Sequence, residues 1–200
     1  NSVNFINVGQ GDCCLIQNGS NVVMIDTGGN ISFDMAKESL IPYLRKQRIY
    51  KIDYLIGTHG DFDHTGAVNS LINNYPVKNY IDSKAKFPLK IGNLTLLNYN
   101  KYNIPGENES SLVISLNFMG YKFLFMGDAP MEIEDKIIKD NPNLKADIIK
   151  IGHHGSSTSS SASSTPGTRR RPEGIARGRH RPAYWISSTS QKVKPLIQYQ

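Results

Sequence analysis

Two histidines and two aspartates lie within six residues, directly after an apolar stretch of the chain. The stretch Ile52–Thr58 predicts a buried strand that leads into a polar loop. Imidazole nitrogens and carboxylate oxygens are ligands for zinc or manganese, and a bound cation would offset the cost of burying the carboxylates together. The alternative is a surface loop whose acids cap the next helix. The pattern favours a metal site, and its candidate ligands are His59, Asp61, Asp63 and His64.

Other expected strands also end in acids or histidines. A strand over Val3–Val8 ends in Gly9-Gln10-Gly11-Asp12, and the next strand end carries Asp26-Thr27-Gly28. Two later strands end in Gly127-Asp128 and in the pair His153-His154. A lone aspartate at such a place is also typical of a helix N-cap. The two histidines followed by glycine and serine are the more specific signal.

The remaining pattern predicts a chain in which strands dominate, with a few helices between them. The Asn18-Gly19 turn predicts a hairpin of Cys13–Gln17 with Asn21–Ile25. We further expect a helix over Asp34–Gln47 that Pro42 kinks or delays, a helix from Thr65, a strand at Val77–Ile81, a hairpin around Gly92, strands at Ser111–Phe118, Tyr121–Met126 and Asp147–Ile151, and a helix over Met131–Lys139.

The order of these motifs resembles the metallo-β-lactamase superfamily. The loop reads H-x-D-x-D-H, so Asp61 stands where the superfamily signature H-x-H-x-D-H has its second histidine. The stretches Asn7–Asp12, Phe125–Ala129 and Ile151–Ser156 look most like the C-terminal domain of the DNA-internalisation competence protein ComEC and its stand-alone relatives. The resemblance covers roughly residues 3–160.

This resemblance implies an α+β fold, an αββα sandwich that is incomplete at its C-terminus, with two divalent metal ions, manganese or zinc. His59 and Asp61 would ligate one metal, and Asp63 and His64 the second. Asp128 would bridge both, and either His153, which we prefer, or His154 would complete the set. The supporting residues implied around these ligands are Asp26, which orients the loop, Asp12 and the remaining histidine, His154.

Two departures from the family pattern stand out. Many members place a histidine ligand near Glu107-Asn108-Glu109, where this chain has none and Asn108 is the candidate replacement. The family also closes its fold with a strand and a Gly-His-Pro segment, in place of which this chain has Arg179-His180-Arg181-Pro182.

The charge of the chain divides at about residue 164. Residues 1–163 carry 15 Lys and Arg against 16 Asp and Glu, whereas residues 164–200 carry 8 against 1. We therefore predict a metallo-β-lactamase-like domain over 1–163 and a basic low-complexity tail over 164–200, which is either disordered or foreign to the fold. The net charge of +6 belongs to the tail and says little about the site.

The resemblance implies a metal-dependent hydrolase, a DNA phosphodiesterase linked to DNA uptake that favours single-stranded DNA and has Asp63 and Asp128 as catalytic residues. The alternatives are hydrolysis of another ester, thioester or lactam, and a non-catalytic DNA-binding or structural domain. Tyr99, Lys101 and Tyr102 are candidate DNA contacts. We expect no membrane segment in these residues. A fragment of a competence protein would be tethered at the outer face of the cell membrane, and a complete chain would be soluble.

Overall fold

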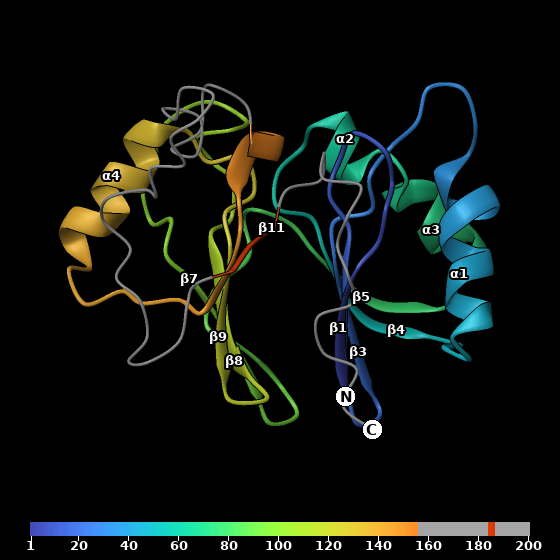
Figure 1. Cartoon of the computed structure of the whole chain (residues 1–200). Helices are drawn as coiled ribbons and strands as arrows, with labels where there is room; N and C mark the ends of the chain where they lie inside the picture. The colour runs from blue at the N-terminus through green and yellow to red at the C-terminus, as the bar shows by residue number, and fades with distance from the viewer. Residues whose placement is uncertain (156–183, 187–200) are drawn as a thin grey trace. The chain divides into compact units, whose positions relative to one another are not determined.

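The computed structural model describes residues 1–155 and 184–186, and the chain divides into two compact units (Figure 1). The first unit contains residues 1–85. The described part of the second contains residues 86–155 and 184–186. Each unit has one mixed β-sheet with helices, which confirms the predicted α+β class.

The sheet of the first unit has five strands in the order β1-β2-β3-β4-β5. The first three strands pair antiparallel, and β3, β4 and β5 pair parallel. Because parallel neighbours end at the same edge, the loops after β3, β4 and β5 gather there. The elements are β1 (Ser2–Phe5), β2 (Cys14–Asn18), β3 (Asn21–Ile25), a π-helical turn (Ala36–Leu40), α1 (Ile41–Lys46), β4 (Ile52–Ile56), α2 (Phe62–Thr65), α3 (Val68–Asn74) and β5 (Val77–Ile81).

Helices α1 and α3 cover one face of this sheet (Figure 1). Their buried side chains, among them Leu44 and Leu71, pack in one cluster with Leu15, Met24 and Leu55 from the strands. The apolar positions of two helices and three strands thus form a single core, which fixes the strands whose ends carry the polar motifs.

The late helix start expected at Pro42 is confirmed, because α1 begins at Ile41, and one other helix expectation in this unit needs correction. Pro42 lies in the first turn of α1. The chain enters α1 through a π-helical turn, which the Ile41 N–H and the Ala36 carbonyl close. The helix expected from Thr65 through Val68 and Leu71 is α3, which starts three residues later, at Val68. The short helix α2, from Phe62 to Thr65, precedes it and is not predicted by the sequence pattern.

The sheet of the second unit has the order β11-β10-β9-β8-β7-β6. Strands β6 to β9 pair antiparallel, while β9, β10 and β11 are parallel. Ile133 and Ile137 of α4 pack with Val113, Leu124 and Ile149 to form the core of this unit. Its elements are β6 (Leu89–Ile91), β7 (Leu94–Asn98), β8 (Ile114–Phe118), β9 (Tyr121–Phe125), α4 (Met131–Asp140), β10 (Ile148–Lys150), a 3-10 turn (Gly152–Gly155) and β11 (Tyr184–Ile186).

Strand β11 comes from the segment for which the sequence predicts a basic tail. Its three residues pair in register with Ile148, Ile149 and Lys150 of β10. The rest of that segment, His180 included, lies outside the described residues, so the division at 163 and 164 stays a prediction. Among the helices of the described residues, none is long and apolar enough to cross a membrane.

Candidate metal centre

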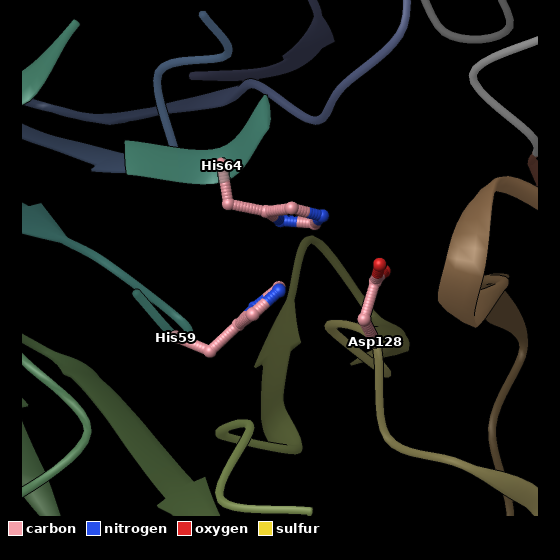
Figure 2. A group of neighbouring side chains, drawn as sticks. All are labelled: His59, His64 and Asp128. Atoms are coloured by element: carbon pink, nitrogen blue, oxygen red, sulfur yellow. The ribbon is translucent and has the colours of Figure 1, made fainter. Parts of the chain in front are cut away.

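Two buried imidazoles lie side by side in the loop after β4. His59 is 2% exposed and His64 is fully buried. Their ring centroids are 4.2 Å apart, and the rings are inclined at 51° (Figure 2). Two adjacent buried imidazoles are typical of a metal site.

The carboxylate of Asp26 holds this loop in place from the end of β3. Its Oδ1 accepts the backbone N–H of Thr58 at 2.8 Å, and its Oδ2 accepts the Thr58 hydroxyl at 2.9 Å. Oδ2 also lies 3.0 Å from Nδ1 of His64. A carboxylate only accepts, so Nδ1 carries the proton and Nε2 of His64 keeps its lone pair for a metal.

The second histidine has its own hydrogen-bond partner. Nδ1 of His59 is 3.1 Å from the hydroxyl of Thr58, which is fully buried. Nε2 of His59 lies 3.5 Å from Oδ2 of Asp61, so these two candidate ligand atoms are close enough to bind the same metal ion. Thr58 thus links Asp26 to both imidazoles.

Asp61 and Asp63 flank the first residue of α2 and are less buried than the histidines. Asp61 has extended backbone angles at the helix N-cap, and its side chain is 43% exposed. The carbonyl of Asp61 accepts from the N–H groups of His64 and Thr65 at 3.0 and 2.9 Å. This turn places the two carboxylates and two imidazoles of the H-x-D-x-D-H loop within six residues of backbone.

The turn after β1 packs against the same loop. The N–H of Asp12 donates to the carbonyl of Asp63 at 3.3 Å, and the N–H of Gly28 donates to the carbonyl of Asp12 at 2.9 Å. Gly11 has φ +134° and would direct a Cβ into the Asp63 carbonyl, so only glycine fits. The side chains of Asp12, Asp26 and His64 offer ligand atoms within 4.8 Å of one another.

In the second unit, Asp128 and His153 lie near each other at the ends of the parallel strands β9 and β10. Asp128 is 3% exposed. Its Oδ1 accepts the N–H of His153 at 2.8 Å, and its own N–H donates to the hydroxyl of Ser111 at 3.2 Å. The expected role of His154 concerns a side chain outside the described part of the structure.

Four residues other than glycine have a positive φ in the described part of the chain, and two of them are candidate site residues. Asp26 and His153 have φ of +58° and +51°, a region that residues other than glycine seldom occupy. Such conformations persist where surrounding contacts over-determine them and are frequent at functional sites.

The residues fit a divalent cation. His64 offers Nε2 because Asp26 occupies its other nitrogen, and the carboxylates of Asp61 and Asp63 supply oxygen ligands. Among the described residues of the second unit, Nδ1 of His153 and Oδ1 of Asn108 are buried with no hydrogen-bond partner. Buried polar atoms are normally paired, so these two are suited to a cation or to a water molecule.

Two residue groups have roles that sequence reasoning did not assign. Thr58 and Ser111 hold Asp26, His59 and Asp128 through their hydroxyls. Thr58 precedes the first histidine directly, which is the one signal that could have pointed to it. Nothing in the sequence near Ser111 indicates its contact with Asp128, which lies 17 positions away.

The candidate DNA contacts Tyr99 and Tyr102 pack against the core of the second unit. The hydroxyl of Tyr102 donates to Oδ2 of Asp140 at 2.7 Å. Burial and then this carboxylate raise the pKa of Tyr102 to about 12. That Tyr99, Lys101 and Tyr102 contact DNA stays a prediction.

Comparison with known proteins agrees with this architecture. Residues 6–91 match the family model described as the metallo-beta-lactamase superfamily. The ComE operon protein 3 of Bacillus subtilis is 29% identical over 198 residues, which cover 77% of this chain and 25% of that protein. The Recombination protein 2 of Haemophilus influenzae is 29% identical over 176 residues, 80% of this chain and 22% of that protein. The chain thus spans about a quarter of the length of these relatives.

Solved structures show the same fold at low identity. The metallo-β-lactamase SMB-1 has a TM-score of 0.56 at 12% identity, covering 77% of this chain and 78% of that one. The metallo-β-lactamase fold protein YhfI from Bacillus subtilis has a TM-score of 0.51 at 14% identity, covering 72% and 65%. Residues 6–91 thus match the metallo-β-lactamase superfamily model, the solved neighbours share the fold, and the similar curated proteins include a competence protein.

Proposed function

We propose that this domain is a metal-dependent DNA phosphodiesterase that uses two divalent ions, manganese or zinc. The observation that carries the proposal is the pair of buried imidazoles 4.2 Å apart, one of them oriented by Asp26. An arrangement of this kind is costly to bury without a cation. The ligands we propose are His59, Asp61, Asp63, His64, Asp128 and His153.

The chain's own residues prepare the site for a phosphodiester. Asp26 keeps the proton of His64 on Nδ1, and Thr58 directs His59, so both imidazoles are fixed before substrate arrives. Bound divalent ions supply an activated water and neutralise charge on the attacking and leaving oxygens. With that chemistry available, no protein nucleophile is required, and Asp63 and Asp128 act by holding the ions.

DNA is the preferred substrate because of the relatives. The curated proteins that match are named a ComE operon protein, a recombination protein and a competence protein. The charge of residues 1–163 is close to neutral, so the preference does not rest on a basic surface. As part of a longer competence protein, the domain would act on single-stranded DNA at the outer face of the cell membrane.

The test is cleavage of labelled single-stranded and double-stranded DNA by the purified chain with Mn²⁺, with Zn²⁺ and with chelator. Metal content is measured on the same samples. We expect metal-dependent cleavage that falls by more than about a hundredfold in Asp63→Ala, since even residues that only support a ligand cost 10–100-fold. Glu38→Ala is the matched control, because it removes an exposed carboxylate of the same unit.

The other outcomes distinguish the alternatives. Bound metal without DNA cleavage would indicate a hydrolase of another ester, thioester or lactam. A chain that neither binds metal nor cuts DNA would be a non-catalytic domain, and the proposal would be wrong.

A further inference from the structure

Phe62 stands between the two carboxylates of the candidate metal loop and is about half exposed. It is the first residue of α2, with Asp61 before it and Asp63 after it. Its side chain is 51% exposed and does not belong to the hydrophobic core of the first unit. An aromatic ring in this position therefore adds little to the packing of the unit, although exposing it has a cost in water.

Two glycines hold the ring. A Cβ added at Gly29 would lie 2.9 Å from Cε1 and 3.0 Å from Cδ1 of Phe62. A Cβ added at Gly66 would lie 2.8 Å from Cδ2 and 2.9 Å from Cε2. The two long edges of the ring thus occupy space that a side chain at Gly29 or at Gly66 would need.

This cradle fixes the orientation of the ring. Gly66 follows Phe62 by four residues, so the two share a face of the helical turn, while Gly29 comes from the loop after β3. A ring held from both sides loses little conformational freedom when a ligand covers its exposed part. It is a rigid apolar surface beside the residues proposed to hold the metal ions.

We propose that the Phe62 ring is a stacking platform for a nucleobase of the bound DNA strand, next to the phosphodiester that is cut. The inference rests on the proposed function, which places single-stranded DNA at this loop. Unpaired bases stack on aromatic side chains with little regard for sequence, since every base has a π-face. One such contact positions the strand without requiring a basic groove in residues 1–163.

The experiment compares the full chain with Phe62→Ala, Phe62→Leu and Phe62→Trp. The substrates are one single-stranded oligonucleotide and its counterpart with abasic sites around the cut. We expect Phe62→Ala to raise KM on the normal strand about fivefold to a hundredfold, with kcat nearly unchanged and little effect on the abasic strand. Phe62→Trp should restore KM, whereas Phe62→Leu, which keeps an apolar side chain without a π-face, should not.

A fluorescent adenine analogue in the strand gives a second readout that does not need cleavage. Stacking quenches its emission, so the wild-type chain in chelator should quench it and Phe62→Ala should not. Tyr50→Ala is the matched control, because Tyr50 is 69% exposed and precedes β4, whereas Phe62 follows it. It should leave both KM and quenching unchanged.

The outcomes separate this inference from the proposed function. Cleavage by the wild type with equal KM in Phe62→Ala, or equal losses on normal and abasic strands, would overturn the stacking role alone. Quenching by the wild type without any metal-dependent cleavage would overturn the nuclease and leave a DNA-binding surface. Neither quenching nor cleavage would overturn both.

Discussion

Asp26 and His64 are joined by a buried contact of 3.0 Å between Oδ2 and Nδ1, although 38 residues separate them in the chain. The same carboxylate accepts two hydrogen bonds from Thr58. Since β3 and β4 are parallel neighbours, this one side chain ties the loop after β4 to the end of β3. The contact therefore couples the geometry of the candidate metal loop to the register of the sheet.

Replacing this carboxylate should weaken metal binding more than it weakens the fold. Asp26→Asn keeps the size of the side chain, and asparagine tolerates the positive φ at this position. The NH₂ group of asparagine is a hydrogen-bond donor. It would face another donor, which is either a group of Thr58 or the Nδ1–H of His64. We expect about a 10–100-fold loss of Zn²⁺ or Mn²⁺ affinity by calorimetric titration.

Asp34→Asn is the control for this change. Asp34 accepts the Ser70 hydroxyl at 2.9 and 2.7 Å in the same unit but outside the loop. It should leave metal affinity within a factor of about two. Equal metal affinity in Asp26→Asn and the wild type would show that His64 needs no partner to be a ligand.

Metal binding should stabilise the chain against unfolding. A ligand bound only by the native state adds about 2.7 kcal/mol at a hundred times its Kd, so Tm should rise on adding Zn²⁺ or Mn²⁺ and fall again with chelator. His64→Ala should remove this increment. Leu71→Ala, a fully buried residue of α3, should lower stability by about 2–5 kcal/mol yet keep the increment. A metal-induced rise that persists in His64→Ala would exclude that histidine as a ligand.

Strand positions and candidate ligands could be predicted from the sequence because they depend on local pattern. The apolar stretches that become β4, β9 and β10 are short and easily recognised, and each is followed three residues after its end by histidine or aspartate. Hairpin turns at Gly19 and Gly92 and the strand Val77–Ile81 also follow from local residues.

The remaining features depend on contacts between distant residues. The hydroxyl of Ser111 accepts the N–H of Asp128, and this pairing requires the fold to be known. The sequence does not predict α2, because Gly60 and Gly66 are typical of a loop. In the structure, the N–H of Gly66 closes the turn on the Phe62 carbonyl at 2.8 Å, so the helix begins inside the motif.

Acid should weaken the first unit through Asp53. Burial opposes ionisation of this carboxyl, but hydrogen bonds from Lys51, Lys78 and the Val22 N–H outweigh burial and lower its pKa to about 2. The unfolded chain, with a carboxyl pKa near its ordinary value of 3.8, binds more protons between pH 4 and 2. The stabilisation is therefore complete above about pH 4 and is lost as pH falls towards 2.

The measurement is urea unfolding of the wild type and Asp53→Asn at a series of pH values. The free energy of unfolding of the wild type should fall more steeply below about pH 4 than that of the variant. Near neutral pH the variant should be less stable, because Val22 N–H, 3.0 Å from Oδ2, loses a charged acceptor. Parallel pH profiles would show that Asp53 does not stabilise the fold by its charge.

A methyl group at Gly66 should disturb the candidate metal loop even though alanine is the better helix former. The φ of Gly66 is −58°, so alanine meets no backbone penalty and would ordinarily stabilise a helix by about 1 kcal/mol. Here its Cβ would meet the Phe62 carbonyl and ring. We expect Gly66→Ala to lower Tm and metal affinity together, whereas Gly66→Ala with Phe62→Ala should recover part of the loss by removing the ring. A Gly66→Ala chain with raised Tm would mean that the ring does not occupy this space.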